Sequence, residues 1–166
     1  EDLYLPFKPK RRTRAIIAKE RGLEPLADRI WSQAKEGNPD QEAEKFVNAA
    51  KEVPNAAAAL AGARDICAER IAENADVRKL VREAYMRDGV IHVKKNEEHE
   101  GKATKFDTYA TFEGAIAGMP SHRYLAIRRG EAEGVLRASV ELDGEKQLGP
   151  ISKMAGLDGS SPWAAE

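Results

Sequence analysis

A mainly helical fold is what this 166-residue sequence predicts: a helical bundle with a helix-turn-helix-like pair and a small antiparallel β element. Up to residue 88, apolar residues recur at the spacing of helix faces, and Gly and Pro separate one such segment from the next. Two later segments, at about 90–94 and 135–142, have the β-branched or alternating pattern of strands. Hydrophobic residues make up 42% and charged residues 33% of the chain, so a folded globular protein is expected rather than a disordered one.

The N-terminal part is predicted to be an extended basic arm over residues 1–14, because Pro6 and Pro9 disfavour helix. A first helix is expected to begin at about residue 12 or 13 and to stop at Gly22. A second helix is entered at Pro25, a favourable first-turn residue. Its apolar face is formed by Leu23, Leu26, Ala27, Ile30 and Trp31. These two helices are the predicted helix-turn-helix-like pair.

Three further helices complete the predicted bundle, which extends over residues 15–88. Asp40 is expected to cap a short helix with Phe46 and Val47 facing inward. A longer helix is expected from about 55 to 73, and the next from 76 to 87 follows the i, i+3, i+4, i+7, i+8 spacing throughout.

The pattern changes after Gly89, and residues 89–145 are predicted to form a small α/β portion of the same module. A strand at 90–94 is followed by a polar loop, then by a helix over 106–119 and a helix capped by Ser121 that stops at Gly130. Apolar and polar residues alternate over 136–142, which predicts a half-buried strand that pairs with the first. Residues 146–166 are expected to be an irregular tail with at most one more helical turn.

The net charge is −1, so the chain as a whole is not a polycation. Any binding of nucleic acid is therefore expected at a local cluster of cations. Five cations fall within seven residues of the arm, which suits contact with phosphates: Lys8, Lys10, Arg11, Arg12 and Arg14. Alternatively, the arm packs on other parts of its parent protein and pairs with acidic helices there. A second cationic patch is predicted at Arg123, Arg128 and Arg129, for which a solvated or ion-paired helix face is the alternative.

Other chemistry is not expected. Ser121 and His122 are adjacent, but no carboxylate is placed by the sequence to orient the histidine, so no enzyme is predicted. The histidine and glutamate spacing around 92–100 matches no zinc or calcium pattern, so neither a metal nor a cofactor is expected. Cys67 lies in an apolar helical pattern and is interpreted as a small buried hydrophobe. Without a long apolar run or a secretion signal, a cytoplasmic protein with no membrane partner is expected.

Several blocks of the sequence together resemble the Tex family of bacterial transcription accessory proteins. The clearest is Pro-Ser-His-Arg-Tyr-Leu-Ala-Ile-Arg-Arg-Gly-Glu at 120–131; the others are 1–13, 22–28, 59–66 and 105–109. The resemblance implies an internal fragment, the helix-turn-helix-containing region that precedes a ribonuclease-H-like domain. In that family, nucleic-acid binding is credited mostly to a C-terminal oligonucleotide-binding barrel.

The resemblance implies a nucleic-acid-associated scaffold module with RNA or DNA and the other domains of the parent chain as partners. Within the helix-turn-helix-like pair, DNA readout would use Asp28, Arg29, Ser32 and Gln33 of the second helix. The alternative function is a purely structural interdomain module that makes no contact with nucleic acid.

Overall fold

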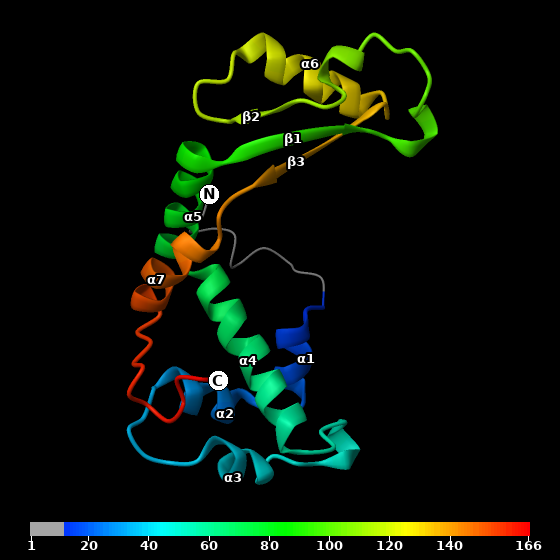
Figure 1. Ribbon diagram of the computed structural model, residues 1–166. Coiled ribbons are helices and arrows are strands. Elements are labelled where there is room, and N and C mark those ends of the chain that lie inside the picture. The colour runs from blue at the N-terminus through cyan, green and yellow to red at the C-terminus, as the bar shows by residue number, and fades with distance from the viewer. Residues whose placement is uncertain (1–11) are drawn as a thin grey trace. The chain divides into compact units, whose positions relative to one another are not determined.

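The computed structural model describes residues 12–166 and confirms the mainly helical fold class with a small antiparallel sheet. The chain divides into two compact units, which are called here the first unit (1–78 with 149–166) and the second unit (79–148). The described residues contain seven α-helices and one three-stranded sheet (Figure 1).

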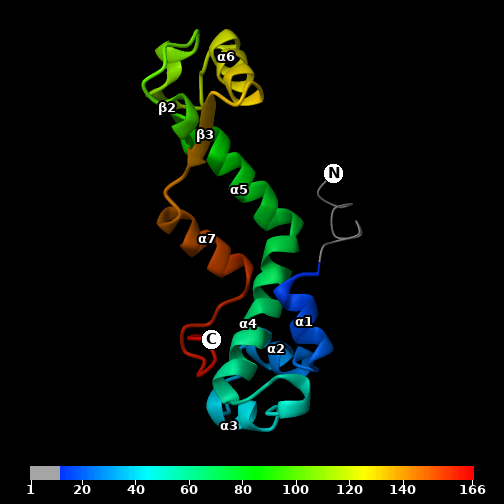
Figure 2. The ribbon, with the colours of Figure 1, turned by 90° about the vertical axis from the view of Figure 1, so that its right-hand side faces the viewer.

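The first unit is built around its longest helix, against which three shorter helices pack. These are α1 (Arg14–Glu20), α2 (Glu24–Trp31) and α3 (Pro39–Glu44), and the long helix is α4 (Ala56–Glu73). Figure 2 shows α1 and α2 beside α4. Asparagine or threonine side chains accept a backbone N–H at three helix starts, which satisfies donors that the first turn leaves free.

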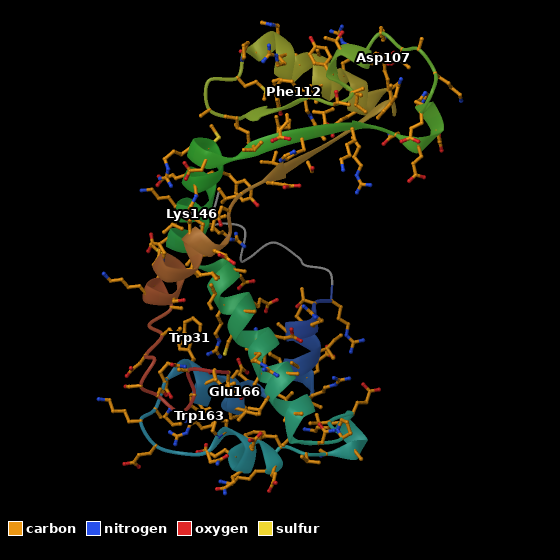
Figure 3. The ribbon with its side chains drawn as sticks, in the orientation of Figure 1. Trp31, Asp107, Phe112, Lys146, Trp163 and Glu166 are labelled. Atoms are coloured by element: carbon orange, nitrogen blue, oxygen red, sulfur yellow. The ribbon has the colours of Figure 1, made fainter. Side chains whose placement is uncertain are left out.

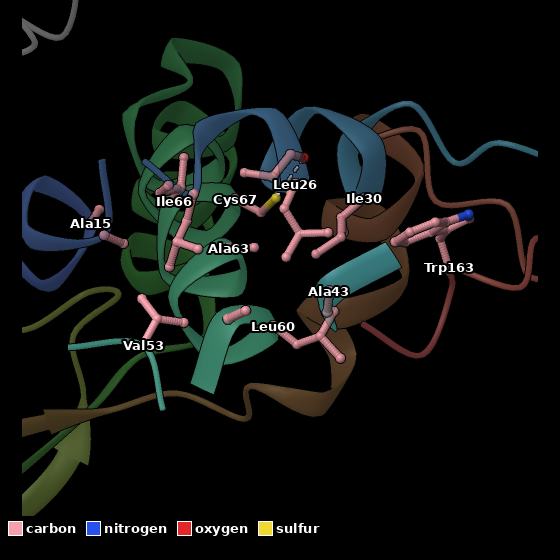
Figure 4. Packing of buried hydrophobic residues seen from close by; sticks show 14 residues of the cluster. Ala15, Leu26, Ile30, Ala43, Val53, Leu60, Ala63, Ile66, Cys67 and Trp163 are labelled. Atoms are coloured by element: carbon pink, nitrogen blue, oxygen red, sulfur yellow. Dashed lines mark hydrogen bonds between the residues drawn. The ribbon is translucent and has the colours of Figure 1, made fainter. Parts of the chain in front are cut away.

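Small residues on α4 allow the other helices to approach closely. Ala59 and Ala63 are fully buried members of the core cluster, and Figure 4 shows Ala63 among its neighbours. At Gly62, an added Cβ would lie 2.4 Å from Leu23 Cδ1 and 3.3 Å from Ala18 Cβ, so a side chain there would push α1 and the following turn outward. Gly22, with φ of +83°, makes that turn in a backbone region that disfavours other residues.

The C-terminal segment closes this core. Trp163 is completely buried, its indole N–H donates to the carbonyl of Glu36 at 3.1 Å, and the Arg29 guanidinium lies 5.5 Å from its ring centroid. Ser161 donates to the carbonyl of Ala34 at 2.8 Å. Figure 4 shows the indole beside Ala43 and Ile30. The weakly patterned tail therefore supplies the largest buried side chain of the protein's described part.

The second unit is a three-stranded antiparallel sheet with a helix on one face. The strand order is β2 (Glu113–Ala115), β1 (Val90–Lys95), β3 (Leu136–Glu141), and α6 (Ser121–Ala132) covers one side (Figure 1). The inner face buries a cluster formed by Ile91, Val93, Phe106, Ile127, Val135 and Leu136.

Two helices border this sheet in the sequence. Helix α5 (Ala75–Asp88) leads into β1, and α7 (Glu145–Met154) follows β3. The side chain of Asn74 accepts the N–H groups of Asp76 and Val77 and so caps α5. Each of these helices includes residues of both units.

The prediction of a helix over 106–119 is wrong. The structure has a short 3₁₀ turn, η4 (Asp107–Tyr109), followed by β2, whose Gly114 pairs with Ile91. Threonines and glycines lower the helix propensity of this stretch. Pairing with β1 satisfies the backbone of residues 113–115 instead, and Phe106 is buried in the cluster of the second unit.

The sequence also misplaced two helix caps. Asn38, and not Asp40, caps α3 by accepting the N–H of Gln41. Ser121 is the first residue of α6, and the N-cap position is Pro120, which makes no side-chain capping bond. The helix continues through Gly130 to Ala132, because glycine there fits against Leu136, whose Cδ1 would lie 2.5 Å from an added Cβ.

We expect Trp163→Ala to lower the free energy of unfolding by about 3–5 kcal/mol, because it leaves a large cavity under the C-terminal segment. Urea unfolding followed by far-ultraviolet circular dichroism measures the change. Trp31→Ala is the matched control, since Trp31 is 38% exposed and its ring lies at the surface under the guanidinium of Arg70. Equal losses in the two variants would contradict a structural role specific to Trp163.

Candidate nucleic-acid interface

The basic arm is described only at its C-terminal end: Lys8, Lys10 and Arg11 lie outside the described residues. Arg12 and Arg14 make exposed ion pairs, with Glu20 at 2.6 Å and with Asp65 at 3.6 Å. Their side chains are 67% and 87% exposed. Because surface ion pairs contribute roughly 0–1 kcal/mol, both guanidinium groups can exchange these carboxylates for another anion at little cost.

The start of α1, which follows the arm in the sequence, is held against α4 by hydrogen bonds of Thr13. The hydroxyl of Thr13 accepts the N–H of Ile16 at 3.1 Å, which caps α1, and donates to Glu69 of α4 at 2.8 Å. Lys19 also pairs with Glu69, at 3.3 Å. The cap and the interhelical contact therefore use the same side chain, and they hold the start of α1 against α4.

The second predicted patch is not assembled on one face of α6. Arg123 and Arg128 are about 140° apart around a helix with 3.6 residues per turn. Arg123 lies over the ring of Phe112, 5.0 Å from its centroid, and Arg128 pairs with Glu131. Glu131 also accepts the N–H of Ala138 at 3.1 Å, so this pair belongs to the junction between α6 and β3. Of the three predicted cations, Arg129 is exposed and makes no ion pair with a described residue.

In the helix-turn-helix-like pair, the side chains that were expected to contact DNA bases instead make contacts within the first unit. Asp28 pairs with Arg70 of α4 at 2.6 Å, and Arg29 pairs with Glu42 of α3 at 3.0 Å. Ser32 and Gln33 donate to backbone carbonyls at the end of α2. These contacts favour the packing interpretation of the pair over base readout.

Sequence reasoning missed two cations on the outer face of the sheet. Lys94 of β1 is directly opposite Arg137 of β3 in the antiparallel register, and both side chains are exposed. Further along the same face, His92 has Glu113 at 3.3 Å and Glu141 at 3.6 Å. The signal was present in the alternation of 136–142, which places Arg137 on the polar face, but the sequence does not reveal its neighbour across the sheet.

The adjacent Lys95 is turned to the opposite face and is occupied there. Its ammonium group lies 2.7 Å from Asp107 Oδ1, and its side chain is 15% exposed. The hydroxyl of Thr104 donates to the same carboxylate at 2.6 Å, and its backbone N–H donates at 3.1 Å. Figure 3 labels Asp107, which begins η4 after the loop that follows β1. Lys95 therefore holds this loop, and Lys94 alone of the two lysines faces outward.

The thiol of Cys67 is buried in the first unit. Burial raises the pKa of the Cys67 thiol, with Arg70 partly opposing the shift, and its Sγ lies 3.4 Å from the carbonyl of Ala27. Over residues 12–166, no group of three acidic, histidine or cysteine side chains is arranged to hold a metal ion. Ser121 and His122 are both exposed on α6. None of the helices in this range is both long and apolar enough to cross a membrane.

Comparison with known proteins decides the family. Residues 34–157 match the family described as Tex central region-like. The chain belongs to this family. It is 45% identical over 145 residues to Protein tex of Bordetella pertussis and 46% identical over 145 residues to Protein YhgF of Escherichia coli. It is also 41% identical over 141 residues to the transcriptional accessory protein Tex of Neisseria gonorrhoeae.

These alignments cover 85–87% of this chain but only 18% of each of those three relatives. Each of these relatives is therefore much longer than this chain. The resemblance noted in blocks such as 120–131 is confirmed at the level of the family.

Asp107 generates a prediction about acid stability. The pKa of this carboxyl is lowered to about 2, mainly by its hydrogen bond with Lys95 and then by its hydrogen bonds with Thr104. A carboxyl with a pKa lowered by folding stabilises the protein above its unfolded-state pKa of about 4, and the effect is lost as pH falls to about 2. We expect NMR titration of Asp107 to give a midpoint near 2, and Lys95→Met to raise it. A midpoint near 4 in the unsubstituted protein would contradict the contact.

Proposed function

We propose that this chain is a nucleic-acid-associated scaffold module of a Tex-like transcription accessory protein, without catalytic activity of its own. RNA or DNA and the other parts of the parent protein are its partners, and the bacterial cytoplasm is its place of action. In this proposal the arm cations Lys8, Lys10, Arg11, Arg12 and Arg14 contact phosphates.

One observation carries the proposal: five cations in seven residues lead directly into a helix that is anchored to its unit. Clustered cations bind a polyanion because they release its condensed counterions. The two described members keep highly exposed guanidinium groups in weak surface pairs. Membership of the Tex central region-like family supports the same class of partner through the name that one relative carries, a transcriptional accessory protein.

Replacing all five arm cations with alanine should abolish binding to single-stranded RNA and duplex DNA at low salt. In the unsubstituted chain, the logarithm of the binding constant should fall with the logarithm of salt concentration, with a slope of about −0.7 per phosphate on single strands. Fluorescence anisotropy with labelled oligonucleotides at several salt concentrations measures both effects.

The matched control keeps the charge of the arm. Arg11→Lys, Arg12→Lys and Arg14→Lys together should retain most of the affinity, because phosphate contact needs positive charge more than guanidinium geometry. Unchanged affinity in the alanine variant would overturn the role of the arm.

A second candidate function, an interdomain structural module, is favoured by an apolar groove in the second unit. The groove has a volume of about 330 Å³ and is lined by Ile91, Ile116, Met119, Tyr124, Leu125 and Val140. Leu125 is 61% exposed. An apolar hollow with large exposed side chains is typical of a surface that another protein segment covers.

If the groove is such a surface, this chain should self-associate through it at high concentration when no other partner is present. Sedimentation velocity over a concentration series measures the association, and Leu125→Lys should weaken it. Leu148→Lys is the control, because Leu148 is equally exposed in the same unit but does not line the groove. A chain that stays monomeric at all concentrations would contradict the prediction.

A further inference from the structure

The outer face of the sheet in the second unit has a cationic centre that no helix of that unit covers. Residues of β1 alternate between buried and less buried positions, and Ile91 and Val93 point toward α6. Lys94 is the register partner of Arg137, and His92 is the partner of Ser139. Partners in an antiparallel pair point to the same face, about 4.5–5.5 Å apart at Cα. One small anion can therefore contact both Lys94 and Arg137.

The close approach of the two positive charges of Lys94 and Arg137 is electrostatically unfavourable unless an anion lies between them. Like charges directly opposite one another destabilise a sheet. Among residues 12–166, neither Lys94 nor Arg137 has a carboxylate partner, although nearby cations of the unit do: Lys95 pairs with Asp107 and Lys105 with Glu133. Lys94 and Arg137, neither of which has an ion pair, therefore face each other across the strands.

The surface around them is hollowed. One depression, of about 310 Å³, is lined by His92, Lys94, Arg137, Ser139 and Glu141. A second, of about 680 Å³, shares Lys94 and Arg137 and continues toward Asn96 and Gly134. The cationic pair lies where the two depressions meet. An ammonium and a planar guanidinium together provide the point charge and the paired donors that suit a phosphate group.

We propose that Lys94 and Arg137 form a phosphodiester-binding site for single-stranded nucleic acid, with the Ser139 hydroxyl as an additional donor. The inference rests on the proposed function and adds a second contact, separate from the arm. Carboxylates limit the site on both sides: Glu113 and Glu141 beside His92, and Glu97, Glu98 and Glu100 at the far rim. A polyanion that followed the strands would meet these carboxylates, so the nucleic-acid backbone crosses the strands and leaves one phosphate at the site.

The site also implies recognition without sequence preference. Aromatic side chains that stack on bases are the usual means of gripping a single strand. The described residues that line the two depressions include no phenylalanine, tyrosine or tryptophan, and His92 is engaged by two glutamates. Contact is therefore with the backbone, which carries no sequence information.

The test uses labelled single-stranded dT and rU oligonucleotides and the whole chain. Lys94→Ala with Arg137→Ala should weaken binding about tenfold and make the salt slope less steep by about 0.7, the value for one phosphate on a single strand. Arg87→Ala with Lys105→Ala is the control, since it removes the same charge from the same unit at two cations that pair with Asp88 and Glu133. The exchange of Lys94→Arg with Arg137→Lys should retain affinity.

The outcomes separate this inference from the proposed function. If the arm variant loses binding and the sheet variant does not, the sheet site is refuted while the role of the arm stands. Loss of the same size in the control variant would also refute it, because net charge alone would then explain the effect. Competition by poly-aspartate as effective as that by the oligonucleotide, and sensitive to the same two substitutions, would instead make the face a site for an acidic peptide. Circular dichroism of each variant confirms that loss of binding is not loss of fold.

Discussion

Close packing along one face of α4 is the constraint on which the first unit depends. Ala59, Gly62 and Ala63 present little volume to the three helices that pack on α4, and at Gly62 the side chains of Ala18 and Leu23 occupy the space that a Cβ would take. Because protein interiors are packed as densely as organic crystals, a larger side chain at any of these places would have to displace a neighbouring helix. The start of α1 is positioned by this packing, and with it the end of the basic arm.

The same packing determines which charges are available to a partner. Arg29 and Arg70 are drawn into contacts that join helices, with Glu42 and Asp28 as partners. Removing such a cation from its carboxylate to contact a phosphate would weaken the contact between two elements. A cation that serves a ligand without this cost must lie outside this network, as Lys94 does, or be held only by a weak surface pair, as the 87% exposed Arg14 is by Asp65.

The net charge of −1 consequently says little about the surface that a nucleic acid would meet. The carboxylates that balance the cations are placed as specifically as the cations are, and several are used in structural pairs. At ordinary ionic strength, charges more than about 8–10 Å apart are largely screened, so the local arrangement and not the total decides where an anion binds.

Some helices and strands could be predicted from the sequence and others could not. The helices at 14–31 and 56–88 and the strands at 90–95 and 136–141 were predicted because each carries its own periodic pattern. The short strand β2 was missed, since three residues that include Gly114 have no pattern and become a strand only through β1. Trp163 gave no sign of its burial, because the groups that enclose it, such as Glu36 and Arg29, lie more than 120 residues away in the chain.

The sequence by itself determined the helical class, two of the strands, the presence of five cations within residues 8–14 and the resemblance to the Tex family, all of which depend on local patterns or on the order of residues. Only the tertiary structure decided which cations are paired and which are free. The reason is physical: an ion pair forms between side chains that folding brings within about 4 Å, and the partners Asp28 and Arg70 are 42 positions apart. Lys94 and Arg137 became neighbours in the same way, through the register of two strands.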